Sequence, residues 1–156
     1  MRLSKHFTLR EMTRSQTATR LGIDNMPTDE HIENLIALCE NILEPVREYY
    51  NVPVRISSGY RSSELNKAIG GSRKSQHSNG MAADFEVGGH SNYEVALWIS
   101  ENCDFDQLIL EFYNPEEGPN SGWIHASYHS PEENRHQILT ALRVSGKTVY
   151  KPGFVV

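Results

Sequence analysis

Apolar residues recur every three or four positions between residues 29 and 46, which is the spacing of one buried face of a helix. Asp29 and Glu30 fall in the first turn, where carboxylates interact favourably with the helix N-terminus. Pro45 has no backbone N–H to donate, so we expect a kink near the end. The pattern predicts a core helix and indicates no cofactor. Its apolar residues are Ile32, Leu35, Ile36, Cys39, Ile42, Leu43 and Val46.

Local signals predict three further helices. Residues 8–11 and 91–94 each form a capping box, in which a hydroxyl residue is followed three positions later by Glu. The first predicts a short helix from about Leu9, and the second a helix with an apolar face. Residues 63–69 suit another short helix, because the glycines at positions 70–71 would end it.

Apolar and alternating runs predict the strands, most of which follow the helices in the chain. They are expected at residues 54–57, 82–87, 107–112 and 122–128, with a closing hairpin over residues 137–144 and 148–150. Helices first and strands later favour an α+β fold over a doubly wound sheet. We therefore predict a single α+β domain over residues 1–156, with N-terminal helices packed on a mainly antiparallel sheet.

Composition narrows the class of protein. A chain of 156 residues is long enough for one domain with a real core, and 38% hydrophobic with 22% charged residues is typical of a soluble globular protein. The net charge of −5 argues against a nucleic-acid binder. No apolar run has transmembrane length, and no signal-peptide core follows Met1. We expect a monomer that is made in the cytoplasm without an export signal of its own.

Isolated cysteines and histidines carry weaker signals. Cys39 and Cys103 stand alone in apolar segments and are expected to be buried free thiols. His129 is a minor candidate for substrate contact. The other isolated histidines are expected to be solvated, and they are His6, His31, His90 and His136.

The strongest chemical signal is the set formed by His77, Asp84 and His125. Two imidazoles and one carboxylate are three zinc ligands, and they leave a fourth position for water, as in catalytic rather than structural zinc sites. Strand alternation allows Asp84 and His125 to share one face of a sheet, with His77 in the turn before. The small residues Gly80 and Ala82 would let backbone and ligands crowd near the metal.

These residues resemble a known family. The motif Ser-x-His-x-x-Gly-x-Ala-x-Asp at residues 75–84, followed by Trp-x-His at residues 123–125, resembles the zinc D-alanyl-D-alanine carboxypeptidase family. That family includes D-Ala-D-Ala dipeptidases and phage endolysins that cut L-alanyl-D-glutamate bonds. Residues 57–61 look like its Ser-Gly-Tyr-Arg segment, and residues 7–12 and 146–150 look like its small single-domain phage members.

The resemblance implies zinc at His77, Asp84 and His125, and Arg61 as the arginine that binds substrate near the metal. Ser75 and Trp123, in the same motifs, are the other candidates for substrate contact. The implied substrate is a peptidoglycan stem peptide.

The sequence departs from the family at one position. Several members carry the catalytic glutamate three residues before the last zinc histidine, and Gly122 stands there in this chain. Glu111, at the end of the strand predicted beside that of His125, is our candidate for the general base. Glu86 is the next candidate. Glu116 and Glu117 lie in a loop that would have to fold over the site.

The sequence thus favours a zinc peptidase that cuts a peptidoglycan stem peptide through a zinc-activated water, as a D,D-carboxypeptidase or a lysin-like endopeptidase. Arg61 suits either a terminal carboxylate or the oxyanion of the transition state. The expected place of action is the cell wall after release. Two alternatives remain open at this point. One is a noncatalytic cell-wall-binding or virion structural module, which Gly122 favours, and the other is a zinc amidohydrolase with an unrelated substrate.

Overall fold

Helices and strands follow one another along the chain much as the hydrophobic pattern predicts. The computed structural model describes residues 1–156. The helices are α1 (Leu9–Thr13), α2 (Gln16–Leu21), α3 (Asp29–Leu38), the π-helical turn η1 (Cys39–Leu43), α4 (Glu44–Tyr50), α5 (Ser63–Ala68), the 3₁₀ turn η2 (Gln76–Asn79) and α6 (Asn92–Asn102). The strands are β1 (Val54–Ser58), β2 (Ala82–Val87), β3 (Gln107–Glu111), β4 (Trp123–Ser127), β5 (Gln137–Val144) and β6 (Lys147–Pro152).

The strands form one six-stranded sheet in the order β1-β2-β4-β3-β5-β6. Every neighbouring pair is antiparallel except β3 and β5, which run parallel. Ser145 and Gly146 join β5 to β6 with φ values of 52° and 78°, and two successive positive φ angles are what a type I′ hairpin turn requires. The predicted α+β class, the mainly antiparallel sheet and the closing hairpin are therefore confirmed.

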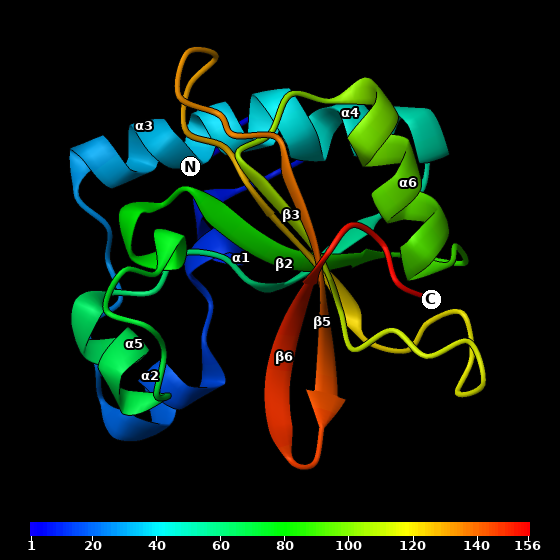
Figure 1. Ribbon diagram of the computed structural model, residues 1–156. Coiled ribbons are helices and arrows are strands. Elements are labelled where there is room, and N and C mark those ends of the chain that lie inside the picture. The colour runs from blue at the N-terminus through cyan, green and yellow to red at the C-terminus, as the bar shows by residue number, and fades with distance from the viewer.

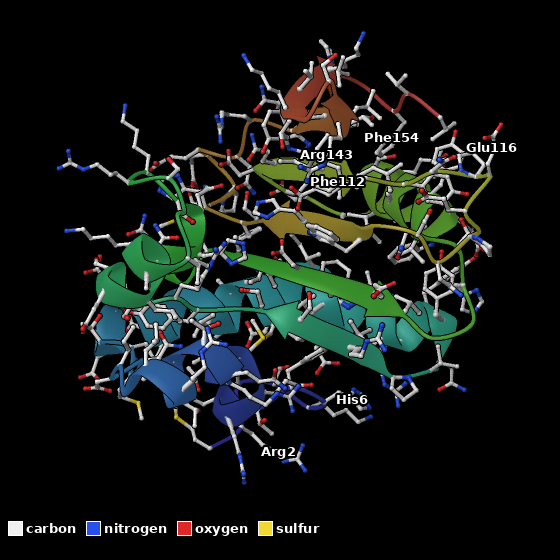
Figure 2. All side chains as sticks on the ribbon, turned by 90° about the horizontal axis from the view of Figure 1, so that it is seen from below. Arg2, His6, Phe112, Glu116, Arg143 and Phe154 are labelled. Carbon is white, nitrogen blue, oxygen red and sulfur yellow. The ribbon has the colours of Figure 1, made fainter.

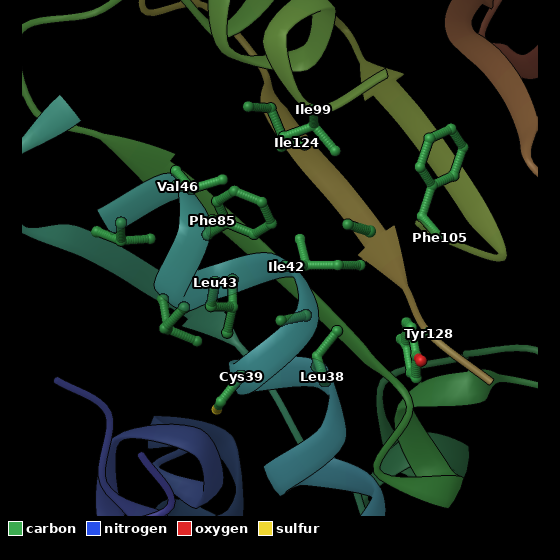
Figure 3. Packing of buried hydrophobic residues seen from close by; sticks show 14 of the residues in the cluster. Leu38, Cys39, Ile42, Leu43, Val46, Phe85, Ile99, Phe105, Ile124 and Tyr128 are labelled. Carbon is green, nitrogen blue, oxygen red and sulfur yellow. The ribbon is translucent and has the colours of Figure 1, made fainter. Parts of the chain in front are cut away.

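The helices cover only one face of the sheet. In Figure 1, α3, η1, α4 and α6 lie above the strands, whereas the β5–β6 hairpin extends below and α2 and α5 lie to the left. Figure 3 shows the core between these layers, where Ile42 and Val46 face Phe85, Ile124 and other apolar side chains of the sheet. Alternation along each strand then directs the neighbouring side chains to the uncovered face.

The helix predicted from residue 29 to residue 46 is interrupted earlier than expected. The irregularity is not a kink at its end but the wider turn η1, and α4 then begins with Pro45 in its first turn. A proline in this place cannot donate to the carbonyl four residues back, and the wider turn lies where that hydrogen bond would have been.

Glu44 follows the π turn and attaches the N-terminal segment to the helix layer. Its carboxylate accepts from the Ser4 hydroxyl at 2.7 Å and interacts with His6 Nδ1 at 2.8 Å. Burial opposes ionisation of Glu44, but the hydrogen bonds from His6 and Ser4 outweigh it and lower its pKa. His6 was expected to be solvated, and this was wrong because Glu44 holds it half-buried.

Two other isolated histidines also differ from expectation. His31 and His90 are half-buried, with ring centroids 5.2 Å from Tyr60 and 4.5 Å from Tyr50. Only His136 is exposed as predicted.

The two thiols are free, as predicted. Cys39 is buried and Cys103 is half-buried. Burial raises the pKa of Cys39 to about 12 and that of Cys103 to about 11, so both thiols stay protonated at neutral pH.

Helix α2 was not predicted, because its six residues are too few to show a periodic pattern. The longest helices are also too short and too polar to cross a membrane.

Asp106 is a buried carboxylate that connects three segments near the uncovered face. Its side chain accepts from Gln76 Nε2 at 2.8 Å, and from the backbone N–H and the guanidinium of Arg135 at 2.9 Å. The hydrogen bond from the Arg135 side chain is the main cause that lowers the pKa of Asp106 to about 2, and it outweighs burial, which would raise this pKa. The carboxylate thus holds η2 and the start of β5 at the entry to β3.

We predict that Asp106→Asn lowers the free energy of unfolding by about 2 kcal/mol at neutral pH, because hydrogen bonds to a charged group are lost. The pKa of Asp106 is lower in the folded state than its ordinary unfolded value near 4, so its stabilisation is complete above about pH 4 and disappears toward about pH 2. Denaturant unfolding of both proteins across this range measures the difference. A difference that does not change with pH would contradict the assignment.

Candidate metal centre

Three side chains from three elements converge on one point of the uncovered face. His77 lies on η2, Asp84 on β2 and His125 on β4, and the β2–β4 register places Asp84 directly opposite His125. Asp84 Oδ1 is 2.9 Å from His125 Nδ1 and 3.5 Å from His77 Nε2. One atom from each residue lies within 4.8 Å of the others, which suits a single ion. The structure thus brings together the three residues that the motif singled out.

His77 is held in the orientation that a ligand needs. The Ser75 hydroxyl caps η2 by accepting from the backbone N–H of His77 at 3.2 Å. His77 Nδ1 is 2.7 Å from the carbonyl oxygen of Gly59, which can only accept, so Nδ1 carries the proton and Nε2 presents its lone pair. Burial lowers the pKa of His77 and keeps the imidazole neutral, the form that binds metals.

Asp84 supplies the negative charge of the centre. Burial opposes its ionisation, but the hydrogen bond from His125 and the nearness of both imidazoles outweigh burial and hold the pKa of Asp84 far below the ordinary range. Burial likewise disfavours the charged form of His125, yet Asp84 outweighs it and raises the pKa of this imidazole. An ionised carboxylate between two imidazoles is a donor set that fits zinc.

A glycine is needed at position 80 for a different reason from the one we expected. It ends η2 with φ +73°, and a Cβ at this position would overlap the backbone carbonyl oxygen of His31 in α3. The small residue therefore makes room for a helix and not for the metal.

The three side chains lie in an open cleft of about 750 Å³ that also contains the other predicted site residues. Arg61, Ser75, Glu111 and Trp123 all line it. The Ser75 hydroxyl caps η2, and it contacts the backbone N–H of His77, not the imidazole of this candidate ligand.

Sequence reasoning missed the wall that β5 and β6 contribute to this cleft. Gln107 lies at the start of a strand that was predicted, but the parallel pairing of β3 with β5 could not be read from the sequence. Tyr150 of β6 lies in the segment at residues 146–150 that resembles small phage members of the family, but the resemblance assigned it no role. The missed lining residues from this part of the chain are Arg135, Gln137, Leu139 and Tyr150.

Glu111 lies on the same face as the candidate ligands. Its Oε2 accepts from the Trp123 indole N–H at 2.6 Å. Burial first, and then the negative charge of Asp84, raise the pKa of Glu111, and no ion pair neutralises it. A carboxylate of this kind is a stronger base than an ordinary glutamate.

The other acidic candidates lie elsewhere. Glu86 shares a face with Asp84, but it forms an ion pair with Arg55 at 2.7 Å and does not line the cleft. The loop that carries Glu116 and Glu117 does not fold over the site, and Figure 2 shows Glu116 at the outer edge of the molecule. His129, the minor candidate, is exposed and pairs with Glu133 at 3.0 Å outside the cleft.

Gly122 has a backbone role that explains the departure from the family pattern. Its φ is +66°, and a Cβ here would overlap the carbonyl oxygen of Glu111 and the backbone of Phe112. No side chain fits at position 122 without moving β3. The loop between β3 and β4 therefore has no room for a glutamate at the usual place.

Arg61 reaches the site from the segment after β1. Its backbone N–H donates to the carbonyl of His77 at 3.1 Å, and its Nε is buried without a hydrogen-bond partner. Burial lowers the pKa of Arg61, and Asp84 and Glu111 oppose this shift from nearby. A buried guanidinium N–H without a partner is costly, and a ligand oxygen would satisfy it.

Two histidines and one carboxylate in a cleft, with an unneutralised carboxylate beside them, define the class of mononuclear zinc hydrolases. A comparison with protein-family models matches residues 5–127 to Peptidase M15. The match covers most of the chain, and the protein belongs to this zinc-dependent metallopeptidase family of D-Ala-D-Ala carboxypeptidases and phage endopeptidases. A search among curated proteins finds no match. The family match ends before β5 and β6.

We predict one zinc ion per chain in the purified protein, measured by elemental analysis, and its loss in His77→Ala. Chelation is also expected to lower the melting temperature, because the ligands come from three separate segments. His136→Ala, at an exposed histidine outside the cleft, is the matched control and should keep the metal. Full occupancy in His77→Ala would rule out the assigned ligand set.

We also predict that Gly122→Ala lowers the free energy of unfolding by about 2 kcal/mol or more, because the new Cβ meets backbone that cannot move freely. Gly89→Ala is the matched control. Gly89 has a similar φ of +75° but open space around it, so its replacement should cost only about 1 kcal/mol. Equal losses of stability in the two variants would show that close packing at Gly122 is unimportant.

Proposed function

We propose that this protein is a zinc-dependent peptidase that hydrolyses a peptide bond in peptidoglycan stem peptides, acting on the cell wall after release. One observation carries the proposal: the candidate ligands share a single cleft with Glu111 and Arg61. A cleft of about 750 Å³ is large enough to hold several residues of a peptide.

Zinc in this centre would be held by His77 Nε2, an Asp84 oxygen and His125 Nδ1. When bound, zinc lowers the pKa of water to about 7 and polarises a carbonyl. The Gly59 carbonyl keeps His77 in the correct tautomer. Asp84 keeps its negative charge, and together these residues preserve the donor set at neutral pH.

Glu111 acts as the general base and then as the general acid. Trp123 engages Oε2, so Oε1 is available to take a proton from the attacking water and to deliver it to the leaving amine. The raised pKa of Glu111 makes its carboxylate a stronger base for the first of these transfers. With Glu111 in the cleft, the absence of a carboxylate at position 122 no longer favours a noncatalytic module.

Arg61 binds and orients the substrate. Its guanidinium presents a fixed fork of donors to a substrate carboxylate or to the carbonyl oxygen that becomes negative during the reaction. Arg61 also lines a second, separate cavity. The bond that is cut distinguishes an endopeptidase from a D,D-carboxypeptidase, and the following experiment identifies it.

Digestion of purified peptidoglycan, followed by mass spectrometry of the fragments, tests the proposal. Fragments cut within the stem peptide, and lost on chelation, would support it and identify the bond. Zinc-loaded protein that releases no fragment would contradict it.

For the base, we predict that Glu111→Gln lowers kcat by about a hundredfold or more and retains zinc, because the amide keeps the size of the side chain but not its basicity. Glu86→Gln is the matched control, since Glu86 lies on the same face outside the cleft. Turnover and metal content are measured on the same preparations. Wild-type turnover in Glu111→Gln would exclude it as the base.

For substrate binding, we predict that Arg61→Lys loses about tenfold or more in kcat/KM while zinc stays bound, because lysine lacks the bidentate geometry. Arg143→Lys is the control, because Arg143 lies over Phe112 outside the metal cleft (Figure 2). Unchanged kcat/KM in Arg61→Lys would leave Arg61 with a structural role only.

A further inference from the structure

Tyr150 lines the metal cleft, but the reaction described above gives it no role. It lies on β6, at the end of the strand order away from β1, and it is 53% exposed. A tyrosine combines an apolar ring with a hydroxyl group, so it can pack against a sheet and still donate a hydrogen bond to a ligand.

The strand register places Tyr150 in line with the proposed general base. Trp123 of β4 pairs with Glu111 of β3, Glu111 with Ala141 of β5, and Ala141 with Tyr150 of β6. Residues that pair directly across neighbouring strands point to the same face of the sheet. These four residues therefore form one row across the uncovered face, which we call the Glu111 row.

The Glu111 row lies beside the row that carries two of the candidate ligands. Asp84 of β2 pairs with His125 of β4, and His125 pairs with Ile109 of β3. His125 and Ile109 are each two positions along the strand from a member of the Glu111 row. Side chains two positions apart share a face and lie about 7 Å apart. Tyr150 is therefore on the face of the metal centre.

Ala141 keeps the space between Glu111 and Tyr150 free of a large side chain. It is fully buried, although its row is on the face that no helix covers, so larger side chains close to it cover it. The backbones of β3 and β6 are two strand spacings apart, or about 10 Å. Two long side chains can approach each other over an alanine across this distance, and a larger residue at position 141 would separate them.

The charges around the Tyr150 hydroxyl agree with this placement. Burial first, and then the negative charges of Glu111 and Asp84, raise the pKa of Tyr150. The ordinary pKa of tyrosine is already near 10, so the phenol keeps its proton at neutral pH and acts as a donor. Its hydroxyl forms no hydrogen bond with another group of the chain.

The neighbouring polar groups of the same wall already have partners. The Arg135 guanidinium donates to Asp106 at 2.9 Å, and the Gln137 side-chain oxygen accepts from Gln107 Nε2 at 2.9 Å. The Tyr150 O–H thus remains available to a ligand in the cleft.

We infer that the Tyr150 hydroxyl donates a hydrogen bond to the carbonyl oxygen of the scissile bond as this oxygen becomes negative. The contact strengthens as charge develops, so it stabilises the transition state more than the bound substrate. Arg61 enters the cleft from the segment after β1 and Tyr150 from β6, so the two donors come from opposite ends of the strand order. The inference rests on the proposed function, because it requires a peptide carbonyl beside Glu111.

Tyr150→Phe removes only the hydroxyl and keeps the ring, so it separates donation from packing. We expect kcat on stem peptides to fall about tenfold or more, with zinc retained and KM changed by less than about twofold, because the lost contact belongs to the transition state. Tyr49→Phe is the matched control. Tyr49 is exposed on α4, stacks on Trp98 outside the cleft and should keep wild-type kcat when replaced. Wild-type kcat in Tyr150→Phe, or a rise in KM alone, would overturn the role.

Binding of transition-state analogues separates this inference from the proposed function. Two phosphinate stem peptides imitate the negatively charged tetrahedral carbon, one at the L-alanyl-D-glutamyl bond and one at the D-alanyl-D-alanine bond. Calorimetry on zinc-loaded protein should show that Tyr150→Phe weakens the tighter-binding phosphinate about tenfold. In the Glu111→Gln background, Tyr150→Phe should leave the affinity for the unmodified peptide unchanged.

The outcomes of this binding measurement are distinct. A loss of phosphinate affinity in Tyr150→Phe supports the role of Tyr150 even if the wild type cleaves no peptide, in which case the proposed function fails. Cleavage by the wild type, with equal phosphinate affinity in wild type and Tyr150→Phe, leaves the peptidase intact and overturns the role. Binding of neither phosphinate by the wild type also overturns it, as does an equal loss of affinity for the phosphinate and the unmodified peptide.

Discussion

The pairing of Asp84 with His125 across β2 and β4 is the contact on which the rest of the site depends. The register that joins them also turns Phe85 and Ile124 into the core beneath the helices. Because side chains alternate along a strand, a slip of one residue would bury the ligands and expose the apolar residues. Core packing therefore selects the register, and the register assembles the metal centre.

Close backbone contacts limit how the chemistry can be arranged around this pair. Gly80 allows η2 to approach α3, and Gly122 allows the loop after β3 to pass against Glu111. Backbone atoms lie too close to position 122 for a side chain there, so the carboxylate beside the metal centre comes from the end of β3 instead. Trp123 then fixes that carboxylate by a hydrogen bond from the next strand.

The cleft has two walls of different character. The wall formed by η2, β2 and β4 lies within the family match and carries the candidate ligands. The wall formed by β5 and β6 lies outside it and contributes Tyr150 among other residues. We expect the second wall to contribute to substrate binding, because it lines the cleft without containing a candidate ligand.

The sequence by itself determined what depends on neighbouring residues. The capping box at Thr8, the alternation in β2 and β4 and the spacing from His77 to Asp84 are all local patterns, and they predicted the helix, the strands and the clustering of the candidate ligands. Only the tertiary structure decided the parallel pairing of β3 with β5, the pairing of His6 with Glu44 and the overlap that reserves position 122 for glycine. The physical reason is the same in each case. These contacts join residues far apart in the chain or separate loops, and their energy depends on packing that no local pattern records.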